Sequence, residues 1–179
     1  MIIREANIHD VQAIARVHVD TWYTTYKGIV PESYLAKISY QQRENAWQKI
    51  IEATMSSSQF IYVAENDSRQ IIGFANGGKE RTGDRTYKGE LYAIYILAAY
   101  QRQEIGYKLI LSVVDKLSDL GFNSMLVWVL ANNPACGFYE NIGGQKVYEK
   151  QIERGRVMLK ETAYGWQDIT TVRDRIHHY

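Results

Sequence analysis

Two kinds of apolar pattern alternate along the chain. In some stretches the apolar residues recur every three or four positions, which is typical of a helix with one buried side. Such helices are predicted at residues 11–22, 31–35, 41–55, 105–120 and 135–141. Other stretches are compact runs of apolar and β-branched residues bounded by turn formers, which predict strands. These runs lie at residues 2–6, 60–65, 71–77, 90–97, 124–130, 146–153 and 156–164.

The order of these elements predicts the fold class. Helices and strands are mixed along the chain, and short polar turns at 66–70 and 154–155 join neighbouring strands as hairpins. We therefore expect an α/β fold with one mixed, mostly antiparallel sheet and helices on its faces. The length of 179 residues predicts a single domain over 1–165, followed by a C-terminal tail or short helix over 166–179.

Composition and charge narrow the class of protein. Hydrophobic residues make up 46% of the chain, as in ordinary globular proteins, and the net charge of +1 argues against a nucleic-acid partner. No stretch approaches the ~20 apolar residues of a membrane helix, and the first residues lack the pattern of a signal peptide. A single cysteine, Cys136, fits a reducing compartment. We expect a cytoplasmic protein with no membrane partner.

The first candidate for chemistry is the polar loop before the predicted helix at 105–120. Its sequence is Tyr100-Gln-Arg-Gln-Glu-Ile-Gly106. A helix start presents unpaired backbone N–H groups that attract phosphate, and a glycine lets the phosphate approach the backbone closely. Arg102 would add positive charge. Taken alone, such a loop is more often an ordinary polar helix cap than a phosphate site.

A second segment, residues 132–144, follows the next predicted strand and changes this interpretation. Together the two segments resemble the Gcn5-related N-acetyltransferase (GNAT) superfamily. That family carries a Gln/Arg-x-x-Gly-x-Gly/Ala loop and then an Asn-x-x-Ala-x-x-Phe-Tyr-x-x-x-Gly segment. The matching positions are Gln101, Gly106, Asn132, Ala135, Phe138, Tyr139 and Gly143. The resemblance, which extends to the order of elements over nearly the whole chain, implies the GNAT fold and acetyl-CoA as co-substrate.

The resemblance also implies where coenzyme A would bind. Backbone N–H groups of residues 103–106 would hold the pyrophosphate, and Asn132 would hydrogen-bond the pantetheine arm. The strand end at 95–97 would pair with that arm, and the N–H of Ile96 or a neighbour would polarise the thioester carbonyl. The expected cofactor contacts are Tyr95, Ile96, Leu97, Gln101, Arg102, Gln103, Glu104, Ile105, Gly106, Tyr107, Asn132, Ala135, Phe138 and Tyr139.

One residue departs from the family pattern. Glu104 stands where the family loop has its first glycine. A left-handed backbone at this position would cost a glutamate roughly 1 kcal/mol. The negative charge is also unfavourable beside phosphates, so Glu104 is expected to weaken coenzyme A binding.

Two residues are the predicted catalytic groups. Tyr139 matches the family tyrosine that protonates the leaving thiolate as general acid, although in some members this tyrosine only positions the thiol. Glu90 stands eleven residues before Gln101, as does a catalytic glutamate in histone-type members. It is the candidate base for the acceptor amine, directly or through water, with a solvated strand-end carboxylate as the alternative. Cys136 is expected to be a small buried residue rather than a nucleophile.

The acceptor site is the least defined part of the prediction. His18, Trp22 and Tyr26 share one helix face if the first helix persists, and Tyr92 lies on the same strand face as Glu90. These aromatic residues would enclose a small amine, with His18 as a second base candidate, or would simply pack against the sheet. No metal is expected, since the histidines, including His177 and His178, show no ligand spacing.

Three alternatives remain open from the sequence. A small-molecule amine acceptor is favoured, but a protein lysine or N-terminal acetyltransferase is a second reading. A non-catalytic acyl-CoA-binding sensor is a third, because it would keep the loop without needing Tyr139 or Glu90. The exposed final strands or the tail offer a surface for a homodimer, which is common in the family.

Overall fold

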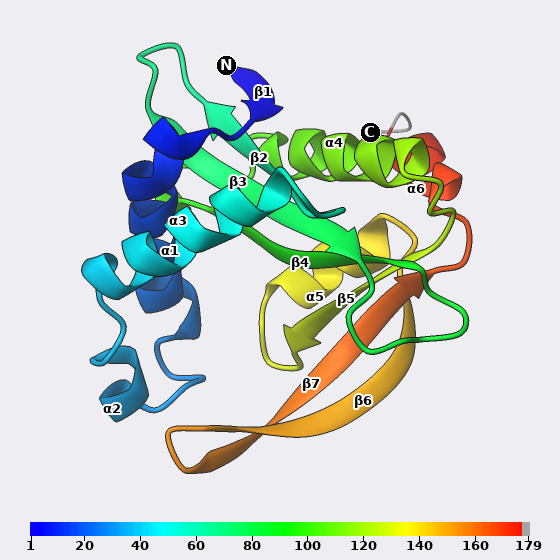
Figure 1. The fold of residues 1–179 in the computed structure, drawn as a ribbon. Helices are drawn as coiled ribbons and strands as arrows, with labels where there is room; N and C mark the ends of the chain where they lie inside the picture. The colour runs from blue at the N-terminus through cyan, green and yellow to red at the C-terminus, as the bar shows by residue number, and fades with distance from the viewer. Residues whose placement is uncertain (177–179) are drawn as a thin grey trace.

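The computed structural model describes residues 1–176, whose strands form one seven-stranded sheet (Figure 1). Across the sheet the order is β1-β2-β3-β4-β5-β7-β6. The strands are β1 (Ile2–Glu5), β2 (Phe60–Glu65), β3 (Ile71–Lys79), β4 (Gly89–Ile96), β5 (Met125–Leu130), β6 (Gln145–Arg154) and β7 (Val157–Trp166). The predicted mixed sheet is confirmed: among the described strands, β4 and β5 form the one parallel pair and the other pairs are antiparallel.

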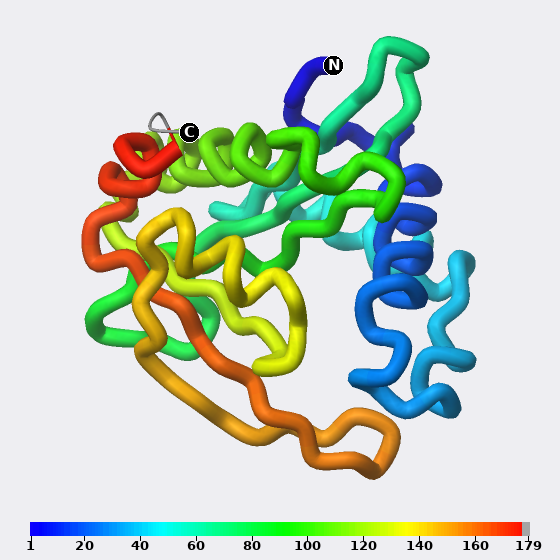
Figure 2. Tube along the Cα trace, turned by 180° about the vertical axis from the view of Figure 1, so that it is seen from behind, coloured from blue at the N-terminus to red at the C-terminus, as the bar shows by residue number. Residues whose placement is uncertain are grey.

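The helices cover both faces of the sheet. They are α1 (Val11–Tyr26), α2 (Glu32–Leu35), α3 (Tyr40–Thr54), α4 (Ile105–Asp119), α5 (Ala135–Asn141) and α6 (Thr170–Ile176), with 3₁₀ turns at Ile8–Asp10 and Ala98–Tyr100. α1 and α3 lie side by side on one face, and α4 and α6 lie side by side on the other (Figures 1 and 2). Each face has its own apolar core, centred on Phe74 and Trp47 beneath α1 and α3, and on Leu109 and Val113 of α4.

The central strands β4 and β5 pair over only part of their length. Their parallel ladder joins Gly89–Leu91 to Met125–Val127, whereas β4 continues to Ile96. Just beyond the ladder, Tyr92 is an extra residue in β4, because Gly77 pairs with Leu91 and Asn76 with Ala93. A bulge of this kind bends a strand and increases its twist. The two strands therefore diverge, and the edge of β4 that would face β5 has no partner strand.

Helix α4 forms where the sequence pattern predicts it. Its buried residues recur at helical spacing and are Ile105, Leu109, Ile110, Val113, Val114 and Leu117. The helix ends at Asp119, and Gly121, two residues on, has the left-handed φ of 80° that is common just after a helix. At the other end, the first residue before the helix is Glu104, also left-handed, with φ 61°.

The C-terminal segment packs on the body of the protein. Trp166, the first residue of the predicted tail, is the last residue of β7, and its Nε1 donates to the Ile142 carbonyl at 2.9 Å. Val172 of α6 is fully buried in the core on the α4 side. His177 and His178 lie outside the described residues. Within residues 1–176, no helix has both the length and the apolar character needed to cross a membrane.

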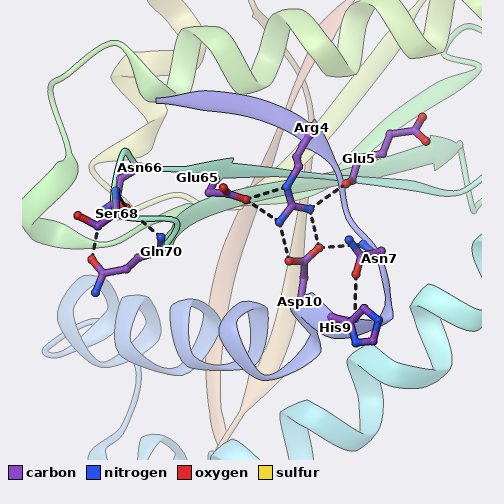
Figure 3. Close-up of polar contacts among 9 residues, drawn as sticks. All are labelled: Arg4, Glu5, Asn7, His9, Asp10, Glu65, Asn66, Ser68 and Gln70. Atoms are coloured by element: carbon purple, nitrogen blue, oxygen red, sulfur yellow. Dashed lines mark hydrogen bonds and ion pairs between the residues drawn. The ribbon is translucent and has the colours of Figure 1, made fainter.

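Arg4 on β1 ties three elements together (Figure 3). Its guanidinium donates to both carboxylate oxygens of Asp10 at 2.7 and 2.8 Å, and to Glu65 on β2 at 2.8 Å. Asp10 also accepts the Asn7 N–H at 2.9 Å, which caps the turn leading into α1. Burial opposes the charge on Asp10, but the bonds from Arg4 and Asn7 outweigh it and lower the pKa of this carboxyl.

Replacing Arg4 by alanine is expected to lower the free energy of unfolding by about 2 kcal/mol. The substitution leaves the buried Asp10 carboxylate without its cation, which costs more than an exposed ion pair contributes. Lys116→Ala is the matched control, since its pair with Glu5 is largely exposed and should contribute less than ~1 kcal/mol. Urea denaturation at pH 7 measures both variants. Equal losses would show that the Arg4 network is no stronger than a surface pair.

Candidate functional site

A cleft of about 720 Å³ opens where β4 and β5 diverge. Its walls come from the end of α1, the outer half of β4, the loop before α4, the end of β5 and α5. The predicted site residues that line it are Tyr26, Tyr92, Tyr95, Ile96, Gln101, Arg102, Glu104, Gly106, Tyr107, Ala135, Phe138 and Tyr139. Residues from the end of α1 and from α5, such as Tyr26 and Tyr139, are far apart in the sequence and meet in this one site.

The loop before α4 presents a row of unpaired backbone donors. Arg102 and Glu104 both have left-handed backbones, with φ of 60° and 61°. Among the described residues, the backbone N–H groups from Arg102 to Gly106 make no well-aligned hydrogen bond to a protein acceptor. Free N–H groups beside the positive end of a helix dipole have the chemistry that suits an anion. The loop is braced by Gln101, whose Nε2 donates to the Ile96 carbonyl at 3.0 Å.

Gly106 provides space for an aromatic ring. A Cβ at this position would lie 3.3 Å from the ring of Phe138, closer than most real contacts of that kind. Phe138 in turn packs against the ring of Tyr107, with 5.3 Å between centroids. The glycine therefore lets α5 approach the start of α4, which brings the two sequence segments together in one wall of the cleft.

Tyr139 faces the cleft from α5 while its ring is anchored in the core. The ring packs against Tyr164 and Trp166, with centroid distances of 5.8 and 6.4 Å. Burial, reinforced by Tyr95 and Cys136, raises the pKa of Tyr139 above its ordinary value of 10. The phenol is therefore protonated at neutral pH and available as a proton or hydrogen-bond donor.

In the turn before α5, Asn133 rather than the predicted Asn132 lines the cleft. Asn133 is buried, its Nδ2 donates to the Tyr26 hydroxyl at 3.1 Å, and its Oδ1 accepts the Ala135 N–H at 2.8 Å. Asn132 lines a separate, smaller pocket beside Ile29. The spacing of the motif predicted which segment lines the cleft, but the direction of each side chain depends on the conformation of the turn into α5.

Glu90 does not line the cleft. Its side chain is 2% exposed and accepts three hydrogen bonds from Arg81, including one at 2.5 Å from Nη2. The Arg81 guanidinium also lies over the ring of Tyr92, 4.2 Å from its centroid. This placement makes Glu90 an anchor for the β3–β4 loop and does not support the predicted role as base.

His18 and Trp22 lie behind the cleft wall rather than in it. His18 Nδ1 accepts a hydrogen bond from Trp47 Nε1 at 3.1 Å, and Trp22 Nε1 donates to the Tyr95 hydroxyl at 3.1 Å. Burial, with a smaller contribution from Arg43, lowers the pKa of His18 to about 3. His18 is thus a neutral core residue at physiological pH, which does not support its use as a second base. Tyr26 is the member of this predicted helix face that reaches the cleft.

Other predicted contacts are structural neighbours of the cleft. Ile105 is buried in the core under α4, and Leu97 packs toward α1, so neither lines the cleft wall; nor does Gln103, whose Nε2 donates to the Ala99 carbonyl at 3.2 Å. Sequence reasoning missed several lining residues, chiefly Thr21, Thr24, Thr25, Trp128, Asn133 and Asn141. The three threonines in the last turns of α1 were the available signal, because such residues are poor helix formers. No metal-binding group of side chains occurs within residues 1–176.

Comparison with known proteins places the chain in a family. Residues 18–143 match the model of the Acetyltransferase (GNAT) family, so this chain belongs to the GNAT acetyltransferases. It is 38% identical over 171 residues to the uncharacterized N-acetyltransferase YuaI of Bacillus subtilis, a match that covers 96% of this chain and 95% of that protein.

Solved structures share the fold at low sequence identity. PaiA N-acetyltransferase from Thermoplasma acidophilum, in complex with coenzyme A, superposes with a TM-score of 0.70 at 22% identity, covering 89% of this chain and 96% of that one. The ribosomal-protein-alanine N-acetyltransferase from Brucella melitensis gives a TM-score of 0.74 at 18% identity, covering 93% of this chain and 99% of that one. The GNAT fold predicted from the sequence is thereby confirmed.

Proposed function

We propose that this protein transfers an acetyl group from acetyl-CoA to a primary amine by direct attack within a ternary complex. One observation carries the proposal: a single cleft joins the unpaired N–H groups at the start of α4 to the protonated phenol of Tyr139. An anion-binding backbone and a nearby proton donor are the two elements that transfer from a phosphate-bearing thioester requires. Family membership supports acetyl-CoA as the donor.

In this proposal the described residues hold coenzyme A along the cleft. The N–H groups of residues 103–106 bind the pyrophosphate, with the side chain of Arg102 at the cleft edge. The edge of β4 around Tyr95 and Ile96, which has no partner strand, pairs with the pantetheine arm through main-chain hydrogen bonds. The Ile96 carbonyl already accepts Gln101 Nε2, which leaves the Ile96 N–H for this pairing. The bulge at Tyr92 and the divergence from β5 support this assignment, because they leave that edge open.

Tyr139 acts on the leaving sulfur. A free thiol has an ordinary pKa near 8.5, below the raised pKa of this phenol, so complete proton transfer from tyrosine to thiolate is uphill. Tyr139 therefore stabilises the developing thiolate by donating a hydrogen bond. It completes the proton transfer as the attacking nitrogen releases its own proton.

A thiol-release assay with acetyl-CoA and a panel of amines tests this function. The panel comprises polyamines, amino acids, aminoglycosides and Lys-bearing peptides, and calorimetry measures acetyl-CoA binding in parallel. We expect binding and turnover with at least one amine. Binding without turnover on any amine would favour the acyl-CoA sensor instead, and turnover restricted to peptides would favour a protein acetyltransferase.

Glu104 gives the proposed pyrophosphate site a specific test. Glu104→Gln removes the charge and keeps a side chain of the same size on the left-handed backbone. We expect it to tighten coenzyme A binding about threefold by removing repulsion of the phosphates. Glu104→Gly also relieves the left-handed backbone, so it should additionally raise the free energy of unfolding by roughly 1 kcal/mol. Calorimetry and urea denaturation separate the two effects. An unchanged affinity in both variants would place the pyrophosphate away from this loop.

A further inference from the structure

A buried hydrogen bond in the cleft joins Tyr26, the last residue of α1, to Asn133 in the turn before α5. Asn133 Nδ2 donates to the Tyr26 hydroxyl at 3.1 Å, and the two residues are 8% and 7% exposed. Both line the cleft. Helix α1 packs in the core of one face of the sheet and α5 in the core of the other. The bond therefore links elements from the two faces at the place where β4 and β5 have diverged.

The same end of α1 is also tied to β4. Trp22 Nε1 donates to the Tyr95 hydroxyl at 3.1 Å. Trp22 and Tyr26 are one helical turn apart, and their rings pack with 4.4 Å between centroids. The last turns of α1 thus connect strand β4, through Tyr95, with Asn133 on the other side of the cleft.

Asn133 in turn fixes the start of α5. Its Oδ1 accepts the Ala135 N–H at 2.8 Å, its carbonyl accepts the Cys136 N–H at 3.1 Å, and its own N–H donates to the Leu130 carbonyl at 2.8 Å. Helix α5 has only seven residues, and a helix this short has little stability of its own. The position of α5 therefore depends on such anchors, and Tyr139 lies on this helix one turn after Ala135.

Tyr26, Tyr95 and Tyr139 all line the cleft and act on one another electrostatically. Burial, reinforced by Tyr95 and Tyr139, raises the pKa of Tyr26, and the bond from Asn133 opposes this rise only in part. Tyr26 is therefore protonated at neutral pH. It serves as a hydrogen-bond partner in this cluster rather than as an acid or a base.

We infer that Tyr26 and Asn133 are positioning residues for acetyl transfer: their hydrogen bond sets the distance between an acyl donor paired with β4 and the Tyr139 hydroxyl on α5. This inference rests on the proposed function and deepens it, because the two residues act through Tyr139 and not on the reacting atoms. The connection runs from β4 through the end of α1 to the start of α5. A displacement of about 1 Å in a positioned group can lower a rate by ~100-fold.

Tyr26→Phe tests the inference, because it keeps the buried ring and removes only the hydroxyl. We expect kcat to fall about tenfold while the dissociation constant for acetyl-CoA changes less than threefold. In a Tyr139→Phe background the same substitution should lower kcat less than about twofold, since the group that it positions is already absent. A loss that merely reflects a disturbed fold would be equally large in both backgrounds.

Tyr23→Phe is the matched control for this substitution. Tyr23 lies on the same helix, and its hydroxyl donates to the Leu35 carbonyl at 3.0 Å, outside the cleft. Its removal should leave kcat within about twofold of the wild-type value, because the bond has no part in the connection to α5. Urea denaturation of each variant checks that it is folded under the assay conditions.

Asn133→Ala removes the other partner of the bond. It also removes the acceptor for the Ala135 N–H, so we expect kcat to fall by more than about tenfold. Adding Tyr26→Phe to this variant should lower kcat by less than a further twofold or so, because both substitutions break the same bond. Falls that multiply in the double variant would show that the two residues act independently and would overturn the inference.

The outcomes separate this inference from the proposed function. An unchanged kcat in Tyr26→Phe, or an equal fall in the wild-type and Tyr139→Phe backgrounds, overturns the inference and leaves acetyl transfer intact. A wild-type kcat in Tyr139→Phe alone overturns the proton donor and, with it, the role of the bond. Absence of turnover with every amine, despite acetyl-CoA binding, overturns the function and the inference together.

Discussion

Tyr139→Phe is expected to lower kcat about 100-fold, with the dissociation constant for acetyl-CoA changed less than threefold. Tyr139 lines the cleft, and its ring packs against the buried rings of Tyr164 and Trp166. Phenylalanine keeps the ring and removes only the proton donor. Loss of a positioned donor in the transition state typically costs 10²–10⁴-fold in rate, and the ~100-fold end applies because a thiolate is already a good leaving group.

Tyr164→Phe is the matched control for this substitution. Tyr164 is buried next to Tyr139, but its hydroxyl donates to Glu140 at 3.0 Å and is not part of the cleft wall. Its removal should leave kcat within twofold of the wild-type value. Steady-state kinetics with a good acceptor, together with calorimetry for acetyl-CoA, checks both variants. A Tyr139→Phe variant with the wild-type kcat would show that Tyr139 is not the proton donor.

Because of His18, the free energy of unfolding is expected to fall by about 2 kcal/mol between pH 7 and pH 5. Burial holds the pKa of His18 at about 3 in the folded protein, compared with 6.5 in the unfolded chain. The unfolded chain therefore binds the proton first as the pH falls. The contribution of neutral His18 to the free energy of unfolding is fully present above about pH 6.5. It is lost at up to ~1.4 kcal/mol per pH unit as the pH falls toward 3.

The structure explains why His18 resists protonation. Nδ1 is occupied as the acceptor of the Trp47 hydrogen bond, and Nε2 is buried without a partner among the described residues. A proton on Nδ1 would break that bond, and the resulting cation would lie among the rings of Phe74, Tyr95 and Trp22. Arg43 adds repulsion.

Urea denaturation at pH 7 and pH 5 measures this effect. His18→Asn retains an acceptor for Trp47 and cannot titrate, so it should remove most of the pH dependence while lowering stability at both pH values through lost volume. His9→Asn, at an exposed position in the first 3₁₀ turn, should keep the wild-type dependence. Carboxyl groups with lowered pKa values, such as Asp10, titrate below this window. A wild-type stability that is constant from pH 7 to pH 5 would contradict the argument.

The sequence alone determined the elements, their order and the family. Helix and strand periodicity located α4, its stop at Gly121 and the strands of the sheet, because these depend on spacing along the chain. The motif residues Gln101, Gly106 and Tyr139 were also predicted from the sequence, and all three line the cleft. Glu104 was recognised as the departure, and its left-handed backbone is observed.

The tertiary structure decided which groups face one another. Glu90 and His18 are candidate bases in the sequence, but Arg81 and Trp47 hydrogen-bond to them in the fold. Arg81 reaches Glu90 across an irregular loop and Trp47 reaches His18 from another helix, so spacing along the chain does not reveal either contact. Asn133 rather than Asn132 lines the cleft, because side chains in a turn do not follow the regular spacing of a helix or strand. The cleft itself exists only because the end of α1 is packed across from the diverging strands β4 and β5. Spacing along the chain thus predicted the segments that line the cleft, whereas the arrangement of the cleft walls arises from contacts between distant elements.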